Sequence, residues 1–241
     1  MHSLEYLIGC AGWSIPGEHA AQFPAEGTHL QRYAQRFPAV EINSSFYRPH
    51  RPETYARWAA STPEGFRFAV KAPREITHTR RLKDADAPLE RFLAEAAALG
   101  EKLGPLLVQL PPSLQFEADV AEEFFRGLRR RFEGGVVLEP RHPSWFTPEV
   151  DRILAGFEVG RVAADPAPVP AAAEPGGWSG LVYFRLHGSP RVYYSRYSEA
   201  YLDTLAAALA PSGGWCIFDN TAAGEATANA LELLERLMRQ P

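Results

Sequence analysis

The sequence predicts an α/β fold, a TIM-like (β/α)8 barrel, and three observations support this prediction. Short apolar runs followed by turn residues recur at intervals of about 30 residues, and eight βα units of that size need about 250 residues. The chain has 241 residues. Between the runs, the spacing of apolar residues becomes helical. The runs themselves are apolar nearly throughout, as in a parallel sheet that is buried on both faces.

Eight strands are predicted, at residues 5–10, 39–43, 66–71, 104–110, 135–141, 159–164, 180–187 and 214–219. Helical spacing of apolar residues covers 89–103, 120–132 and 230–238. Pro52 and the Thr147–Pro148 pair mark two further helix starts, because proline is favoured at the first helical position.

An open, doubly wound sheet is the alternative arrangement for alternating βα units. A dinucleotide-binding sheet would carry G-x-G-x-x-G after its first strand, but the segment from Gly9 to Trp13 lacks the third glycine and Pro16 interrupts the helix start. We therefore favour the barrel, as a single domain over residues 1–241. Four prolines in residues 166–175 predict that the sixth helix is short or missing, and that residues 165–177 form a surface connection rather than a lid.

Composition and charge exclude several classes of protein. With 46% hydrophobic residues the chain is not disordered, and its net charge of −4 disfavours wrapping nucleic acid. Cys10 and Cys216 are too far apart for a disulfide scaffold or zinc cluster, and we expect buried thiols that are neighbours on the first and last strands. No run approaches the roughly 20 apolar residues of a membrane span. No basic leader precedes Arg32, so we expect a soluble, cytoplasmic protein without a membrane partner.

Polar residues interrupt the apolar runs where the predicted strands end, which is where barrel active sites lie. Residues two apart share one face of a strand, so each of three polar pairs should point into the barrel mouth together. These pairs are Glu41 with Asn43, Glu139 with Arg141, and Arg185 with His187, and Lys71, Gln109 and Asp219 join them from three further strands. The set could be a self-contained network of ion pairs. We favour a functional cleft, because burying so many charges is costly and adds no stability.

This set of residues suits acid/base chemistry. Glu41 and Glu139 could face each other across the mouth as proton donor and acceptor. Lys71 and Arg185 supply positive charge for a substrate carboxylate or phosphate, and His187 could shuttle a proton. A divalent metal bound by the acids and His187 is an alternative. Because cations are about as numerous as acids, we assign no metal, and the sequence leaves the cofactor open.

Aromatic side chains follow several strand ends, where their rings could stack on a sugar or a base. We assign catalysis to Glu41, Glu139, His187 and Asp219. We assign substrate binding to Trp13, Asn43, Tyr47, Lys71, His78, Gln109, Arg141, Trp145, Arg185, Tyr194 and Asn220.

A basic cluster surrounds the third predicted βα loop, and it comprises Arg67, Lys71, Arg74, His78, Arg80, Arg81 and Lys83. It could be an anion-binding lip of the cleft or a patch for a nucleic-acid backbone. We prefer the lip, because no nucleic-acid-binding module accompanies it. We expect an enzyme, an isomerase or hydrolase, that acts on a small polar, anionic or sugar-like substrate. A nucleic-acid-binding or nucleic-acid-processing protein and a non-catalytic metabolite-binding barrel are the alternatives.

Several motifs occur together and in a characteristic order: Gly9-x-x-Gly12-Trp13-Ser14, Val40-Glu41-Ile42-Asn43-Ser44-Ser45-Phe46-Tyr47, Phe68-Ala69-Val70-Lys71-Ala72-Pro73-Arg74, Gln109-Leu110-Pro111-Pro112, Glu139-Pro140-Arg141-His142, Arg185-Leu186-His187-Gly188 and Asn220-Thr221. In these motifs the chain resembles the YecE-like family, also called domain of unknown function 72, over residues 5–235. The resemblance implies a TIM-like barrel and a loose relation to sugar isomerases, without an established reaction. Cys10 and Ala11 stand where that family often has Thr and Ser, Pro140 stands where a less rigid residue is usual, and Asp219 where Asn is common.

Overall fold

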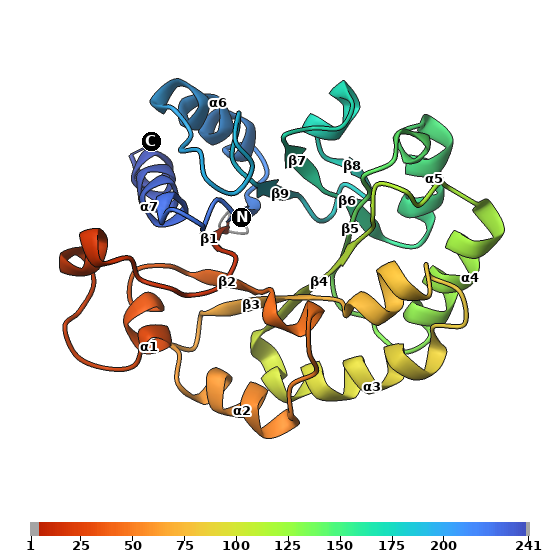
Figure 1. Ribbon diagram of the computed structural model, residues 1–241, viewed down its shortest axis with the longest axis horizontal. Coiled ribbons are helices and arrows are strands. Elements are labelled where there is room, and N and C mark those ends of the chain that lie inside the picture. The colour runs from red at the N-terminus through yellow and green to blue at the C-terminus, as the bar shows by residue number, and fades with distance from the viewer. Residues whose placement is uncertain (1–4, 240–241) are drawn as a thin grey trace.

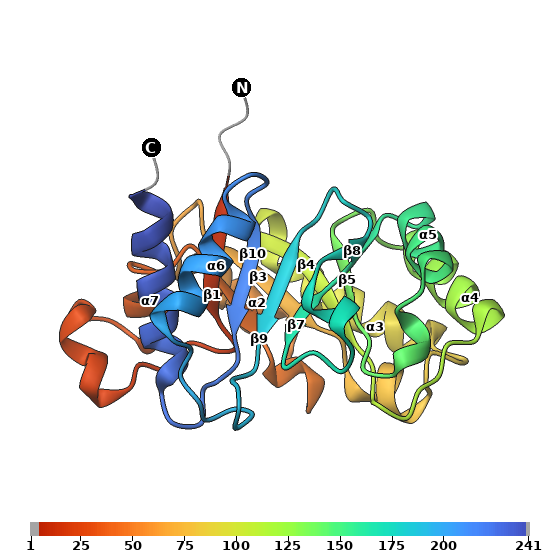
Figure 2. The same cartoon turned by 90° about the horizontal axis from the view of Figure 1, so that it is seen from above.

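The computed structural model describes residues 5–239, which form a ring of parallel strands surrounded by helices (Figure 1). The strands are β1 (Tyr6–Cys10), β2 (Ala39–Ile42), β3 (Arg67–Lys71), β4 (Leu103–Gln109), β5 (Val136–Glu139), β6 (Val159–Arg161), β7 (Ala163–Asp165), β8 (Gly176–Gly177), β9 (Tyr183–Leu186) and β10 (Gly214–Phe218). In sheet order they run β1-β10-β9-β7 and β2-β3-β4-β5-β6-β8. Figure 2 shows β1, β10 and β9 side by side.

Two short connections join these sheets into a closed barrel. β6 and β7 are consecutive parts of one strand separated by Val162, whose N–H donates to the Leu138 carbonyl oxygen at 2.9 Å. β1 meets β2 at a parallel bridge between Ala11 and Glu41, and the Gly12 N–H donates to the Glu41 carbonyl oxygen at 2.9 Å. The ring therefore has eight strand positions, and the predicted TIM-like barrel is confirmed.

The seam between β1 and β2 is tight. A Cβ atom on Gly9 would lie 2.1 Å from the Ala39 carbonyl oxygen, far inside van der Waals contact. Glycine is therefore required there by the close approach of the two backbones.

The outer layer consists of α1 (His29–Tyr33), α2 (Pro52–Ala60), α3 (Asp86–Ala96), α4 (Ala118–Arg129), α5 (Pro148–Gly156), α6 (Glu199–Leu209) and α7 (Glu225–Met238). The predicted helices at 120–132 and 230–238 correspond to α4 and α7. The predicted helix at 89–103 is divided, because α3 ends at Ala96 and a 3-10 helix (Ala97–Lys102) follows it. Within residues 5–239, no helix has both the length and the apolar character needed to cross a membrane.

The sixth unit lacks an α-helix, as its prolines predict. Between β7 and β9 the described chain forms a 3-10 helix (Pro170–Ala173) and β8, which pairs antiparallel with β6. Arg161 holds this segment in place: its guanidinium donates to the Asp151 carboxylate at 2.8 Å and to the Ala171 carbonyl oxygen at 2.9 Å.

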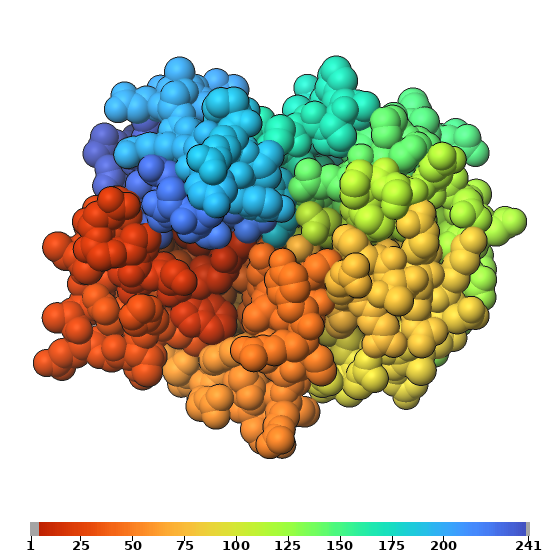
Figure 3. Space-filling model, in the orientation of Figure 1, coloured from red at the N-terminus to blue at the C-terminus, as the bar shows by residue number. Residues whose placement is uncertain are grey.

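The barrel interior and the helix-facing layer contain alternate residues of each strand. The interior cluster comprises Leu7, Ala39, Ala69, Leu107, Val137, Val162, Tyr183, Trp215 and Ile217. Neighbouring positions, such as Ile8, Val40 and Phe68, belong to the larger core between strands and helices. Seen from this side, the space-filling view shows no open channel through the ring, as expected of a barrel whose centre is a packed core (Figure 3).

Cys10 and Cys216 lie on the paired strands β1 and β10, as predicted for neighbours on the first and last strands. Both are free, buried thiols. Burial raises the pKa of Cys10 to about 12, so this side chain behaves as a small apolar group.

Thr147 provides a local test of the predicted helix start at α5. Its Oγ1 accepts a hydrogen bond from the Val150 N–H at 3.2 Å, and Pro148 occupies the first helical position. We expect Thr147→Ala to lower the free energy of unfolding by about 1 kcal/mol, because one N–H of the first turn loses its partner. Thr147→Ser retains the hydroxyl and should retain most of the stability in urea unfolding. Equal losses in both variants would contradict the capping role.

Candidate functional site

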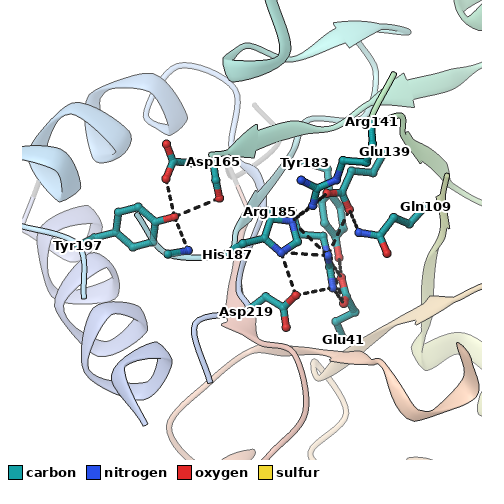
Figure 4. Close-up of polar contacts among 11 residues, drawn as sticks. Glu41, Gln109, Glu139, Arg141, Asp165, Tyr183, Arg185, His187, Tyr197 and Asp219 are labelled. Atoms are coloured by element: carbon teal, nitrogen blue, oxygen red, sulfur yellow. Dashed lines mark hydrogen bonds and ion pairs between the residues drawn. The ribbon is translucent and has the colours of Figure 1, made fainter. Parts of the chain in front are cut away.

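Arg185 lies at the centre of a buried group of charges near the carboxyl ends of the strands (Figure 4). Its Nη2 atom is 2.8 Å from Glu41 Oε1 and 3.0 Å from Asp219 Oδ2, and its Nη1 atom is 3.2 Å from Glu139 Oε2. The side chains of Arg185, Glu41 and Glu139 are all 0% exposed. One guanidinium thus links acids from β2, β5 and the end of β10.

His187 occupies the neighbouring position, between two of these acids. Its Nδ1 atom lies 3.0 Å from Asp219 Oδ2, and its Nε2 atom lies 2.8 Å from Glu139 Oε1. Arg141 Nη2 approaches the same Glu139 oxygen at 2.5 Å. We call Glu41, Glu139, Arg141, Arg185, His187 and Asp219 the charge network. Arg141 Nη2 also lies 2.5 Å from His187 Nε2, and Arg185 Nη1 lies 3.3 Å from it, so the imidazole is surrounded by both acids and guanidinium groups.

Two neutral side chains complete the hydrogen bonding of the carboxylates. The Tyr183 hydroxyl donates to Glu41 Oε2 at 2.9 Å, and the Gln109 amide donates to Glu139 Oε2 at 3.2 Å. Sequence reasoning missed Tyr183. The signal was present, because Tyr183 lies two residues before Arg185 on the same strand and therefore on the same face.

The cations of the charge network keep two of its acids ionised. Burial alone would raise the pKa of the Glu139 carboxyl, but Arg141, Arg185 and His187 hold this pKa well below its usual range. Burial likewise opposes ionisation of Asp219, yet Arg185 and His187 keep its pKa lowered. Glu41 and Glu139, predicted to face each other across the mouth, both contact the Arg185 guanidinium.

These lowered pKa values predict a specific acid sensitivity. The unfolded chain binds protons more tightly than the folded chain at Glu139, so the stabilisation by this group is complete above its ordinary pKa of 4.5 and disappears as pH falls towards the folded value. We expect Glu139→Gln to make the loss of unfolding free energy below about pH 5 shallower. Urea unfolding across pH would test this, with Glu122→Gln, at an exposed ion pair with Arg126, as the control. Parallel pH profiles for wild type and Glu139→Gln would contradict it.

Lys71 ends β3 beside the charge network but belongs to none of its ion pairs. Its Nζ atom lies 4.3 Å from the centre of the Phe46 ring, and within the described chain no carboxylate oxygen lies within 4 Å of it. Burial, reinforced by the nearby Arg185, lowers the pKa of Lys71 to about 8. The amine therefore exchanges protons near neutral pH.

A cleft of about 430 Å³ opens next to the charge network, a size suited to a small molecule. It is lined by His78, Gln109, Leu110, Pro111, Pro112, Arg141, Pro166, Ala167, Pro168, Val192 and Tyr193. Gln109 and Arg141 belong to both the cleft wall and the contacts of Glu139, so the cleft reaches the charge network. The proline-rich connection after β7 forms part of its wall.

Tyr193 lines the cleft, although the sequence analysis did not assign it to substrate binding. Its ring centre lies 6.0 Å from that of the buried His187, and its backbone has a φ of 69°, which is strained for a residue other than glycine. Tyr194, the neighbour that was selected, is turned away and packs under the Arg191 guanidinium at 3.9 Å.

Three of the other predicted substrate-binding residues line hollows that are separate from the cleft. Trp13 and Asn43 line a separate hollow with Gly12, and Trp13 packs edge-on against Trp58 at 5.0 Å. Tyr47 is 75% exposed and borders a third hollow.

Trp145 and Asn220 are not brought to the charge network. Trp145 is buried among apolar side chains, and its indole N–H donates to the Leu114 carbonyl oxygen at 2.9 Å. The Asn220 amide donates to the Ser195 carbonyl oxygen at 2.9 Å and to Asn229 Oδ1 at 3.1 Å. These contacts hold loops and helix α7 in place, and neither Trp145 nor Asn220 lines the cleft.

Two members of the basic cluster of the third loop, Arg80 and Lys83, are paired with nearby acids. Arg80 and Arg91 both contact the Glu75 carboxylate, at 3.3 and 2.7 Å, and Lys83 lies 3.1 Å from Glu117. His78 is the member that lines the cleft. Its pKa is lowered by partial burial and by Lys71.

Between residues 5 and 239, no group of three or more His, Cys, Asp and Glu side chains is arranged to hold a metal ion. The acids considered above as metal ligands are bonded to an arginine instead. Oxygens of Glu41, Glu139 and Asp219 contact the Arg185 guanidinium, so a cation binding there would have to displace it.

Comparison with known families agrees with the fold and the motifs. A family model described as "Protein of unknown function DUF72" matches residues 7–241. The chain belongs to the DUF72 family. The UPF0759 protein YecE of Escherichia coli K12 is 34% identical to this DUF72 chain over 172 residues, which cover 68% of the chain and 61% of YecE. The UPF0759 protein YunF of Bacillus subtilis is 33% identical over 58% of the chain and 52% of YunF. The aligned regions span less than two thirds of the length of either relative. The family match and these identities confirm the predicted resemblance to YecE-like proteins.

Solved structures support the same assignment. A DUF72 family protein from Enterococcus faecalis superposes with a TM-score of 0.80 and 22% identity, over 97% of this DUF72 chain and 95% of that one. The 3-keto-D-glucoside 4-epimerase of E. coli gives a TM-score of 0.57 at 14% identity, over 97% of this chain and 100% of that one. A sugar phosphate isomerase/epimerase from Parabacteroides distasonis gives 0.55 at 12%, over 100% and 98% of the two chains. The barrel therefore resembles those of sugar isomerases and epimerases in fold.

Proposed function

We propose that this DUF72 protein is an enzyme that carries out acid/base chemistry on a small polar, anionic or sugar-like substrate in the cleft at the barrel mouth. The observation that carries the proposal is the position of His187, which lies between two carboxylates beside a cleft lined by Arg141. Such an imidazole can hold and release a proton, while the acids stabilise its charge and fix its orientation.

The exposed parts of the charge network indicate where a substrate would meet it. Arg141 retains 20% and Asp219 retains 8% side-chain exposure, whereas Glu41, Glu139 and His187 have none. Arg141 presents a guanidinium suited to a carboxylate, a phosphate or a carbonyl oxygen. The buried members of the charge network would act without being exposed to solvent, by fixing the positions of charges and protons near the substrate.

The choice of substrate class rests on chemistry and on one analogy. Hydroxyl groups and an anionic group match the amide and guanidinium donors of the cleft. The barrel shares its fold with an enzyme described as a 3-keto-D-glucoside 4-epimerase and with one described as a sugar phosphate isomerase/epimerase. Fold likeness alone does not transfer a reaction, but it makes polyhydroxylated carbonyl compounds the first class to screen.

Solvent exchange would test the proposal even when the product has not been identified. The protein is incubated in D2O with aldoses, ketoses, their phosphates and sugar acids, and proton NMR follows loss of the C–H signal beside the carbonyl. We expect exchange with at least one anionic member, and at least a tenfold rise in KM for Arg141→Ala. Arg126→Ala, at an exposed ion pair on α4, is the matched control. Full activity in folded Arg141→Ala and His187→Asn variants, or no conversion of any compound, would refute the proposal.

A further inference from the structure

Lysine is rare in this chain, and its three lysines have different surroundings. Only Lys71, Lys83 and Lys102 occur among 25 basic residues. Lys102 Nζ donates to the carbonyl oxygens of Ala59 and Thr62, both at 2.6 Å, and Lys83 pairs with a carboxylate on the surface. Among residues 5–239, Lys71 Nζ has neither kind of partner. Its amine is therefore free for a ligand.

The surroundings of Lys71 favour an unprotonated amine that solvent still reaches. The residue is 5% exposed and its Nζ packs on the Phe46 ring. Within the described chain Nζ has no hydrogen-bond partner, yet it is not sealed from solvent, unlike the unpartnered polar atoms of Asn43, Tyr55 and Asn220. With a pKa lowered by burial to about 8, about one amine in ten carries no proton at pH 7.

Arginine would serve better if this position only bound an anion. The chain uses arginine for nearly all of its ion pairs, and a guanidinium stays charged at any ordinary pH. A lysine amine offers a different property, because its neutral form is a nucleophile towards carbonyl carbon.

We propose that Lys71 is a catalytic nucleophile that forms a transient imine with a small aldehyde or ketone bound at the barrel mouth. This inference rests on the proposed function for the class of substrate. Lys71 does not itself line the cleft, but its Nζ packs on the same Phe46 ring as His78, which does. It adds a covalent step and assigns Lys71 a role beyond anion binding.

The step balances without an added oxidant or reductant. The Nζ lone pair forms a C–N bond to the carbonyl carbon, and the C=O π electrons move to oxygen, which takes up a proton. One nitrogen proton then moves to this hydroxyl group, and departure of water leaves a protonated imine. This cation acidifies the adjacent C–H, whose proton passes to a carboxylate of the charge network, with Asp219 the most exposed. Reprotonation of carbon and addition of water then release the product and regenerate the amine.

Reductive trapping tests the nucleophile directly. Wild-type protein is treated with glyoxylate, a two-carbon anionic aldehyde, and with sodium cyanoborohydride, and peptide mass spectrometry locates carboxymethyl-lysine. We expect at least tenfold more adduct at Lys71 than at Lys83, although the Lys83 side chain is 53% exposed. The adduct should increase from pH 6 to pH 8. Lys71→Arg should remove it, whereas Lys83→Arg, the matched control, should leave Lys71 labelling unchanged.

The outcomes separate this inference from the proposed function. Labelling that follows exposure, with Lys83 modified and Lys71 unmodified, overturns the imine. Solvent exchange of a substrate that continues in folded Lys71→Arg also overturns it and leaves the proposed function standing. Selective labelling of Lys71 without conversion of any screened compound supports the reactive amine and counts against the proposed function.

Discussion

Replacing Arg185 with methionine should lower the free energy of unfolding by about 3–5 kcal/mol, because it leaves buried anions without their counter-charge. The guanidinium contacts Glu41, Glu139 and Asp219, and its side chain is 0% exposed. Methionine fills a similar volume but offers no donor to these carboxylates. Urea unfolding at neutral pH, followed by circular dichroism, measures the loss.

An exposed ion pair provides the control for this variant. Arg126 lies 3.3 Å from Glu122 on the surface of α4, and both side chains are at least 40% exposed. We expect Arg126→Met to change stability by less than about 0.5 kcal/mol. Adding Glu139→Gln to Arg185→Met should recover part of the loss, since it removes one stranded charge. If the free energy of unfolding of Arg185→Met equals that of Arg126→Met, the charge network does not stabilise the barrel.

Replacing Lys71 with methionine should have the opposite effect and raise the free energy of unfolding by about 3 kcal/mol at pH 7, while abolishing catalysis. The pKa of Lys71 falls from 10.5 to about 8 on folding, mainly through burial, so below pH 8 folding must bury an ammonium that prefers water. Between about pH 8 and 10.5 the unfolded chain binds more protons at this site, and wild-type stability should rise with pH. Lys71→Met should remove that rise.

The other two lysines distinguish this effect from a general benefit of removing charge. Lys102→Met loses hydrogen bonds to two carbonyl oxygens and to the Thr62 hydroxyl, so it should destabilise the protein. Lys83→Met removes an exposed pair and should be nearly neutral. If Lys71→Met is less stable than wild type in pH-dependent urea unfolding, the surroundings of Lys71 stabilise its ammonium, contrary to this prediction.

The fold could be predicted because its signals are local. Each barrel strand is a short apolar run, and the prolines after β7 exclude a helix whatever surrounds them. The boundary after α3 could not be predicted, because apolar spacing continues past Ala96. The backbone leaves the helical region at Gly100, where φ is 59° and ψ is −136°.

The charge network was partly predictable for the same reason. Alternation along a strand fixes which side chains share a face, and it places Glu139 beside Arg141 and Arg185 beside His187. Alternation does not determine which charges meet across the barrel, because that depends on how strands far apart in sequence align. The insertion of Arg185 between acids is such a long-range outcome.

Residues just after a strand follow no alternation. Trp145 follows β5 as closely as several cleft residues follow their own strands, yet it turns into the apolar layer against Phe116. Its direction depends on tertiary packing, and sequence position alone could not reveal it.

Glu41 has two structural roles in this barrel. Its backbone forms the bridge where the first strand meets the second, and its carboxylate holds Arg185. The seam between the first two strands and the central ion pair therefore share one residue. A barrel that opened at this seam would also release its central ion pair, so the protein can bring its reactive groups into position only when the ring is complete.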